Sequence, residues 1–506
     1  MTKIGAIQRV ANNTAWNLLG QVLPMLVGMA TIPVLIRQLG LDRFGFLTLV
    51  WMLIGYAGVF DFGISRAMTR VVAQRLNDGN VDAARHVSSV GLTYMLLFGC
   101  AVGTLLAITA SGIVEHWLGL PDGLNEEGFR AFLILCTSVP VVMLTSGYAG
   151  CLQAWQHFGV LNRIRIALGF ATYLGPLLIV LVTPRLEAVV GLVVFIRILA
   201  NAAHAYACSQ YCGLRFRPAM PDRASSRELF SLGGWIAVSN FVSPLMTYLD
   251  RLIIGGLLPV RMIAYYATPY DILGKLMIFP YALMNALFPA AAGLGSDTVR
   301  ARVMYFGTLR VMFVLMFPPI FLVVTLAGPG LTLWLGSSFA DHATVAMQVL
   351  AVGILFNVLA QVPATMIQAF GQPRWMAIMH LCELPLFLVT LWFFTSRFGI
   401  VGTACAATLR FTLDALAVFA LAQFRLFGLR TSIVPALLTL LLSLGALFAA
   451  AQVGSGLKSL LVDVLCIFVF FTLAWRFIFT VNERNWVLGL LRPWSGRHKL
   501  NQGEAP

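Results

Sequence analysis

Charged side chains interrupt several apolar stretches of this 506-residue chain. Asp250 and Arg251 stand in one such stretch, and Asp271 and Lys275 stand in the next, beyond a short turn. A formal charge near the centre of a bilayer is costly, so a charged residue inside an apolar helix usually faces a partner, a water-filled cavity or a substrate. These four residues are therefore candidates for ligand binding and for proton or cation coupling.

Helix geometry relates these charges to one another. At about 1.5 Å per residue, Arg251 and Asp271 lie about 9 Å and about 12 Å from the shared turn. We expect them to form an ion pair across the hairpin, with Lys275 one turn deeper and also within reach of Asp271. In one interpretation the pair only stabilises the hairpin. In the other, either Asp250 or Asp271 binds a proton or a cation.

Two further arginines, Arg197 and Arg410, occupy mid-membrane positions in apolar segments. A guanidinium offers a planar fork of N–H donors to phosphate oxygens, so two such groups suit a diphosphate. The alternative is structural, because Asp414 follows Arg410 at the i,i+4 spacing and can neutralise it. Arg197 has Asn201 at that spacing, which leaves its charge less compensated.

His380 and Glu383 stand three residues apart, a spacing that suits metal binding or a proton relay. Two ligands are too few for a metal site, so we expect a hydrogen-bonded core pair and keep Glu383 as a weaker coupling candidate, beside Asp250, Asp271 and Asp414. The eight cysteines indicate neither a disulfide nor a metal set. We predict no metal, no cofactor and no catalytic residue.

The elements that hold these residues are membrane helices. The chain is 59% hydrophobic and 11% charged, with a mean hydropathy of +0.87, which is far more apolar than a soluble protein. Apolar runs of about 20 residues, each long enough to cross a bilayer, predict an all-α integral membrane protein. The fourteen expected helices are 13–36, 44–65, 87–110, 130–154, 166–183, 188–209, 231–256, 263–290, 306–327, 344–370, 376–396, 399–420, 432–452 and 459–481.

The positive charges indicate how these helices cross the membrane. The net charge is +14, but most of the 34 Lys and Arg fall in loops that alternate to one side, which indicates membrane topology rather than nucleic-acid binding. This side is called inner below, and the opposite side outer. Both termini are expected in the cytoplasm. The longest outer connection, about Ser111 to Phe129, is too short for a folded domain.

The chain repeats itself weakly at an offset near 215 residues. The repeat predicts two parallel six-helix halves followed by two extra helices. We expect an N-lobe at 1–210, a cytoplasmic linker at 211–230, a C-lobe at 231–424, extra helices within 425–481 and a cytoplasmic tail at 482–506. The matches pair Trp16 with Trp235, Trp117-Leu118-Gly119 with Trp334-Leu335-Gly336, Leu152-Gln153-Ala154 with Ile367-Gln368-Ala369, and Arg197 and Asn201 with Arg410 and Asp414.

Several stretches resemble the polysaccharide, or O-antigen type, flippases of the superfamily that also holds MATE drug exporters and lipid II flippases. The likeness runs through nearly all of the first twelve helices. It is carried by DFGISRAMTR, YLDRLIIGGLLPVRMIAYYATPYDIL, LTLWLGSSFA, IQAFGQPRW and FGIVGTACAATLR. These patterns are diffuse, so they identify the family more strongly than the cargo.

The resemblance implies a V-shaped pair of lobes around a cavity that opens alternately to the two sides of a bacterial inner membrane. The implied cargo is an undecaprenyl-diphosphate-linked oligosaccharide of an O-antigen, capsule or exopolysaccharide. From their own positions and charges, we expect Arg197, Arg410, Arg251 and Lys275 to bind it. A proton or Na⁺ gradient is the expected energy source for transport. Membrane lipids, a polysaccharide polymerase and chain-length proteins are the implied partners. Two alternatives stay open: a MATE-like cation-coupled exporter of small molecules and, with less support, a membrane polysaccharide polymerase or ligase.

Overall fold

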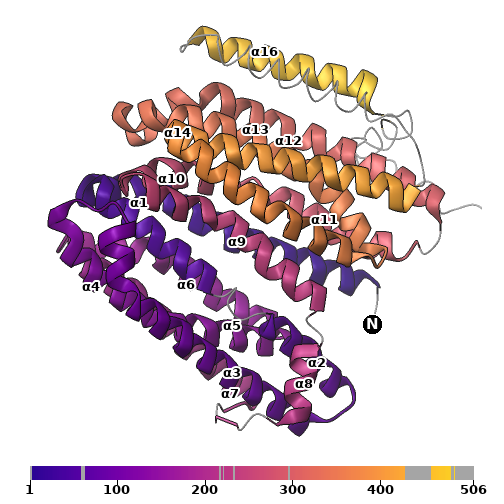
Figure 1. Cartoon of the computed structure of the whole chain (residues 1–506). Coiled ribbons are helices and arrows are strands. Elements are labelled where there is room, and N and C mark those ends of the chain that lie inside the picture. Colours follow the sequence, from indigo (N-terminus) through magenta and orange to yellow (C-terminus); the bar gives the residue numbers. More distant parts are fainter. Residues whose placement is uncertain are drawn as a thin grey trace, which may run out of the picture.

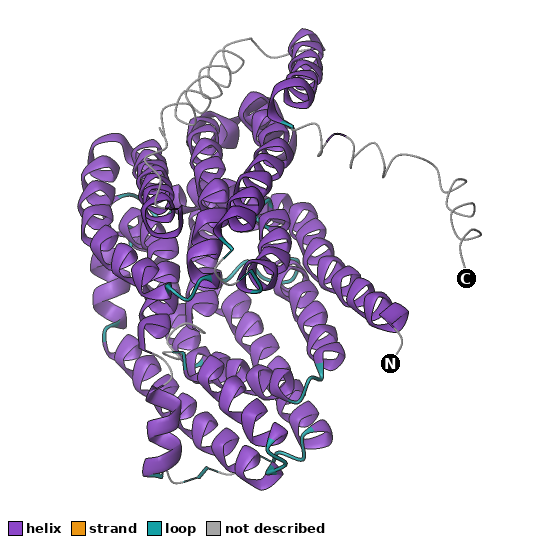
Figure 2. Ribbon diagram, turned by 90° about the vertical axis from the view of Figure 1, so that its right-hand side faces the viewer, coloured by secondary structure: helices purple, strands orange, loops and turns teal. Residues whose placement is uncertain are grey.

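The structure, a computed structural model, describes residues 3–57, 63–215, 218–219, 222–231, 234–294, 297–427, 457–479 and 484. All the regular secondary structure of these residues is helical (Figure 2). Eight of the described helices are long and apolar enough to cross a membrane, or nine if the bent pair α10 and α11 is one span. The chain is therefore a multi-pass membrane protein.

The helices form two bundles that lie side by side (Figure 1). Within each bundle the helices pack mainly on one another, and α1 against α10 is the main direct contact between the bundles. The first bundle holds α1 (Lys3–Ala57), α2 (Ile64–Asn77), α3 (Val81–Ile108), α4 (Asn125–Cys136), α5 (Ser138–Ala154), α6 (Phe158–Val180) and α7 (Leu186–Tyr211). The second holds α9 (Gly234–Leu257), α10 (Arg261–Lys275), α11 (Ile278–Ala292), α12 (Thr298–Leu335), α13 (Ser337–Ala369) and α14 (Pro373–Ala422).

Two of the long helices are broken at a glycine. Gly40 in α1 and Gly399 in α14 both have positive φ, a conformation that glycine adopts without strain. Gly40 falls between predicted helices 1 and 2, and Gly399 is the first residue of predicted helix 12. The hydroxyls of Thr395 and Thr403 lie 2.9 Å apart, whereas eight residues of continuous helix would separate them by about 12 Å. The chain therefore folds back at Gly399.

Some predicted helices are divided in the structure. The segment expected as one helix at 44–65 is interrupted at Gly63, which has φ of 79°, and α2 begins at Ile64. The segment expected at 263–290 is two helices, α10 and α11, which are bent by 42°. Pro280 lies in the first turn of α11 and has no N–H to donate to the preceding turn, which accounts for the bend. The predicted helix at 432–452 lies outside the described residues.

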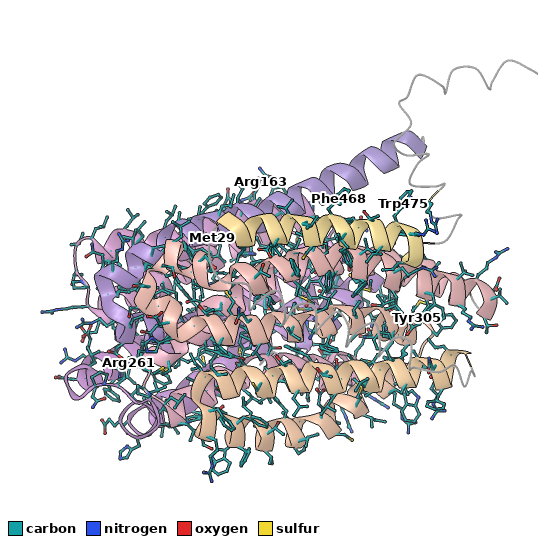
Figure 3. All side chains as sticks on the ribbon, turned by 90° about the horizontal axis from the view of Figure 1, so that it is seen from above. Met29, Arg163, Arg261, Tyr305, Phe468 and Trp475 are labelled. Atoms are coloured by element: carbon teal, nitrogen blue, oxygen red, sulfur yellow. The ribbon has the colours of Figure 1, made fainter. Side chains whose placement is uncertain are left out.

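The ends of the helices mark the two sides of the molecule. Arg261, at the start of α10, lies at one end, and Tyr305 and Trp475 lie at the other (Figure 3). By the charge pattern, the first end is the outer one. The short helix α8 (Arg223–Ser231) lies beside α2 at the inner end (Figure 1).

The last described helix, α16 (Leu457–Leu473), packs on α12 through aromatic rings. Phe470 stacks on Phe317 with ring centroids 4.5 Å apart. This contact leaves much of α16 exposed and apolar, as expected for a helix that faces lipid.

Candidate functional site

The α9–α10 hairpin carries the ion pair that the sequence predicts. Arg251 and Asp271 are joined through Nη2 and Oδ1. The Arg251 side chain is only 3% exposed and lies between the rings of Tyr248 and Tyr270, each 5.9 Å away, whereas Asp271 is 52% exposed. The buried guanidinium thus depends on a carboxylate that still reaches the surface.

Asp250 is held by groups of the same hairpin. It is 2% exposed, accepts a hydrogen bond of 2.7 Å from the Tyr266 hydroxyl and accepts another of 2.8 Å from the backbone N–H of Arg251. Sequence reasoning missed Tyr266. The i,i+4 spacing of Tyr266 and Tyr270, whose rings stack at 5.9 Å, is the signal that places both hydroxyl-bearing rings on one helix face.

Arg410 is held by aromatic rings rather than by Asp414. Its guanidinium carbon lies 4.3 Å from the ring centre of Phe411 and 4.9 Å from that of Phe387. Arg410 Nε and Asp414 Oδ1 are both buried without a hydrogen-bond partner. The possible i,i+4 pairing of Arg410 with Asp414 is therefore not formed, and cation–π contacts position the charge instead.

Asp414 lies beside His380 and Glu383. The ligand atoms of these three side chains all lie within 4.8 Å of one another. Both carboxylate oxygens of Glu383 are buried without a hydrogen-bond partner, so the expected His380–Glu383 hydrogen bond is wrong. The fold-back at Gly399 brings the two halves of α14 together, and this supplies a third ligand that the sequence spacing did not reveal. Such a set can hold a proton or a small cation.

Arg197 stands apart from this cluster, in α7 of the first bundle. Its Nε is buried without a hydrogen-bond partner, and none of the ion pairs among the described residues includes it. Asn201, one turn further along, accepts a hydrogen bond of 3.2 Å from Thr145. The structure thus places Arg197 and Arg410 in different bundles and groups only Arg410 with acidic residues.

Lys275 lines a small cavity between the bundles, together with Asp271. An ion pair between the two is not among those of the described residues, because Arg251 takes that carboxylate. The Trp51 indole N–H is buried on the opposite wall and has no acceptor. The cavity is lined by Met25, Gly28, Met29, Ile32, Phe44, Thr48 and Trp51 of α1, Tyr173 of α6, and Thr268, Asp271, Ile272 and Lys275 of α10.

The bundles are joined at their outer ends by backbone groups. The Gly119 N–H donates to the Gly255 carbonyl at 3.3 Å, and the Val260 N–H donates to the Gly119 carbonyl at 3.2 Å. A Cβ on Gly45 of α1 would lie 2.4 Å from the Val260 carbonyl oxygen, so the approach requires glycine there. We call these four residues the outer clasp. Sequence reasoning missed it, although Gly119 belongs to one of the repeated motifs.

Comparison with known proteins places the chain in a family. The profile of the family described as polysaccharide biosynthesis protein matches residues 10–294. A candidate O-antigen transporter of Shigella flexneri is 30% identical over 411 residues, which cover 80% of this chain and 96% of that protein. The chain belongs to the polysaccharide biosynthesis protein family. A second relative, the lipopolysaccharide biosynthesis protein WzxC of Escherichia coli K12, is 22% identical and covers 69% of this chain and 68% of WzxC.

Comparison with solved structures shows the fold of this family member. An inward-facing multidrug resistance MATE family transporter matches with a TM-score of 0.71 at 12% identity, covering 80% of this chain and 95% of the transporter. The lipid II flippase MurJ in an inward closed conformation matches with a TM-score of 0.69 at 13% identity, covering 90% of this chain and 98% of MurJ. The predicted resemblance to the polysaccharide flippase family is confirmed by the family match, and the solved structures confirm the fold.

Proposed function

We propose that this protein is a flippase that moves an undecaprenyl-diphosphate-linked oligosaccharide across a bacterial inner membrane by alternating access. The family membership, and the 30% identity to a candidate O-antigen transporter over most of both chains, support the proposal. The cargo is the repeat unit of an O-antigen, capsule or exopolysaccharide. The protein does no covalent chemistry.

The observation that carries the cargo assignment is that Arg197 and Arg410 have no carboxylate partner among the described residues. Arg410 is fixed between Phe387 and Phe411, and the ion pairs among the described residues include neither it nor Arg197. A guanidinium without a carboxylate partner keeps its N–H donors available for phosphate oxygens. In the proposed mechanism each bundle offers one arginine to the diphosphate, and Arg251 and Lys275 add positive charge near the inter-bundle cavity.

The outer clasp supports the alternating-access part of the proposal. It joins Gly119 of one bundle to Gly255 and Val260 of the other by two backbone hydrogen bonds, which closes the outer end while cargo enters from the inner side. Two neutral backbone hydrogen bonds contribute only about 1 kcal/mol each, so the clasp is weak enough to break during transport.

The cluster of His380, Glu383 and Asp414 is the proposed coupling site, with Asp250 and Asp271 as further candidates. Uptake of a proton or Na⁺ by this cluster changes the charge beside Arg410, because the guanidinium interacts electrostatically with all three side chains. Ion binding and cargo binding are thereby linked through one residue. The linkage is reciprocal in free energy.

For the complete chain we propose fourteen transmembrane helices, as two parallel six-helix lobes plus two C-terminal helices, with both termini in the cytoplasm. Reporter fusions after Pro121, Pro259 and Lys458 should report the periplasm. Fusions after Asp78, Asp222 and Gln502 should report the cytoplasm. A reversed signal at either end of the chain contradicts this topology.

A MATE-like exporter is the second candidate, favoured by the cluster of His380, Glu383 and Asp414. The deciding experiment uses cells that lack their own O-antigen flippase. The wild-type chain should prevent accumulation of unflipped lipid-linked oligosaccharide, and Arg197→Gln and Arg410→Gln should each fail to do so at normal membrane levels. The matched control is Arg302→Gln, at the inner end of α12. Export of cationic drugs without any effect on lipid-linked sugar would instead establish the exporter.

Replacement of Arg410 has a confounding effect on its acidic neighbours. Arg410→Gln leaves Asp414 without the nearby positive charge, so Arg410→Gln with Asp414→Asn is tested as well. Arg410→Lys should keep part of the activity because it keeps the charge but loses the bidentate fork. Full complementation by Arg197→Gln combined with Arg410→Gln would refute a role for the arginines in cargo binding.

A further inference from the structure

A second polar cavity lies at the inner end of the first bundle, remote from the inter-bundle cavity. It is formed where α3 begins and α7 ends, at the start of the connection to α8. Its lining is basic and hydroxyl-rich: Arg85, His86 and Ser89 of α3, Ser209 of α7, and Gly213, Leu214 and Arg215 of the connection. None of the cargo or coupling candidates contributes to this cavity.

The backbone after α7 is shaped around Arg85. Arg85 Nε donates to the Cys212 carbonyl at 3.3 Å, which fixes the guanidinium. Gly213 has φ of +62°, and a Cβ there would lie 2.6 Å from Arg85 Nη2. Only glycine combines this left-handed conformation with so close an approach. Arg85 is 43% exposed and is held at the cavity by its hydrogen bond to the Cys212 carbonyl.

The lining of the cavity holds two arginines and no acidic residue, and the carboxylates of Asp82 and Asp222 lie against Arg85 and His86. The carboxylate partner of Arg85 is Asp82, which is 95% exposed and 3.4 Å away, so solvent weakens this pair. His86 contacts Asp222 at 2.9 Å. The ion pairs among the described residues do not include Arg215. Two serine hydroxyls complete a set of donors that suits the oxygens of a phosphate group.

Exposed tyrosines lie near the cavity, at the end of a helix long and apolar enough to cross a membrane. Ser209 is in the last turn of α7, where Tyr206 and Tyr211 are 67% and 49% exposed. Exposed tyrosines at a helix end are typical of the membrane–water interface. Basic pockets between membrane helices on the cytoplasmic side are suited to anionic lipid head groups.

We propose that this cavity binds the phosphodiester head group of an anionic membrane phospholipid. Arg85 and Arg215 contact the phosphate oxygens, and Ser89 and Ser209 donate hydrogen bonds to the same group. The site goes beyond the proposed transport function and does not depend on it, because it shares no residue with the cargo path. It places a lipid contact beside the connection between the two bundles.

The experiment measures lipid binding to the full-length protein in detergent by native mass spectrometry. The probes are phosphatidylglycerol, zwitterionic phosphatidylcholine and inorganic phosphate, without any oligosaccharide lipid. The wild type should retain one phosphatidylglycerol in preference to phosphatidylcholine. Arg215→Gln should weaken this binding about fivefold or more, in line with the attraction of one arginine for an anionic surface, and adding Ser209→Asp should abolish it.

Arg302→Gln is the matched control, because it removes the same charge at the inner end of the other bundle and should leave binding unchanged. Arg215 is exposed and makes none of the described ion pairs, so its replacement should not affect folding. Equal phosphatidylglycerol binding by all variants would overturn the proposal. Displacement of the lipid by millimolar inorganic phosphate would overturn the lipid assignment in favour of a free-anion site.

Discussion

Arg410 and Asp414 lie one helical turn apart in α14 and yet do not pair. The guanidinium lies over the rings of Phe411 and Phe387 at 4.3 and 4.9 Å, and Asp414 Oδ1 has no hydrogen-bond partner. Aromatic contact therefore separates a cation from the anion that the spacing offers it. In the proposed mechanism, this separation leaves the charge of Arg410 for the cargo and the carboxylate of Asp414 for a cation or a proton.

The Arg251–Asp271 ion pair should be essential for a stable hairpin. Asp271→Asn leaves the buried Arg251 guanidinium without a carboxylate, and a broken buried pair costs about 3–5 kcal/mol, less here because Asp271 is half exposed. Each single neutralisation should lower the protein level or activity, and Arg251→Asp combined with Asp271→Arg should recover part of it. Thermal stability of the purified variants and complementation are the measurements. A swap no better than the worse single variant means that the pairing has no role.

The outer clasp should control the balance between inward-open and outward-open states. Gly45→Ala places a Cβ 2.4 Å from the Val260 carbonyl oxygen, so the two bundles must separate by about 1 Å at that point. Overpacking costs about 1–3 kcal/mol, which shifts the ratio of the two states by about 5- to 150-fold toward outward-open.

Spin labels at Glu126 and Asp341, with the exposed Cys100 and Cys382 replaced, report this shift as a longer inter-bundle distance at the outer end. The matched control is Gly112→Ala, in the outer connection that holds Gly119, where an added Cβ meets nothing within 4 Å. If Gly45→Ala and Gly112→Ala give the same distance distribution as the wild type, the clasp does not set the balance.

The linker helix α8 should stay docked on the first bundle as the pH falls from 7 to 5. The pKa of Asp222 lies well below its usual range because the Ser225 N–H, the Ser225 hydroxyl and His86 donate hydrogen bonds to the carboxylate. A depressed carboxylate pKa stabilises the docked state above the unfolded pKa of about 3.9, and this contribution is lost only as the pH falls through the still lower folded pKa.

Amide hydrogen exchange of residues 223–231 tests this expectation. After correction for the intrinsic exchange rate, protection should be equal at pH 7 and pH 5, and Asp222→Ala should exchange severalfold faster because it loses both the cap and the His86 contact. Asp78→Ala, an exposed acid on the same side of the bundle, is the control. A loss of protection near pH 5 in the wild type would contradict the assignment.

The sequence predicted the parts of this fold that depend on local pattern. The apolar runs located most of the described helices, and the glycine breaks at Gly40 and Gly399 fall where the pattern had already divided two helices. The Arg251–Asp271 pair also followed from local geometry, because both residues flank one short turn.

Contacts between segments that are far apart in the sequence could not be predicted from local pattern. The grouping of Asp414 with His380 and Glu383 depends on how the two halves of α14 pack after the turn. The outer clasp depends on backbone atoms, which carry no side-chain signature. The position of Arg410 depends on Phe387, which is 23 residues away in the sequence and one of the 36 phenylalanines of the chain.

The cluster of His380, Glu383 and Asp414 should determine the ion dependence of transport. Its ligand atoms lie within 4.8 Å of one another, and ligands bonded at about 2.3–2.6 Å to one central cation lie at most about 5 Å apart, so the cluster has room for one cation of that size. Glu383→Gln and Asp414→Asn should each remove gradient-driven translocation of lipid-linked oligosaccharide in proteoliposomes, while passive exchange persists. Imposed Na⁺ and pH gradients, applied separately, distinguish a sodium site from a proton site.

The matched control is Asp463→Asn in α16, a buried acid that also has an oxygen without a hydrogen-bond partner but lies outside the cluster. Transport by Glu383→Gln and Asp414→Asn with the full wild-type response to both gradients would exclude the cluster as the coupling site, and loss in Asp463→Asn alone would assign coupling to α16 instead.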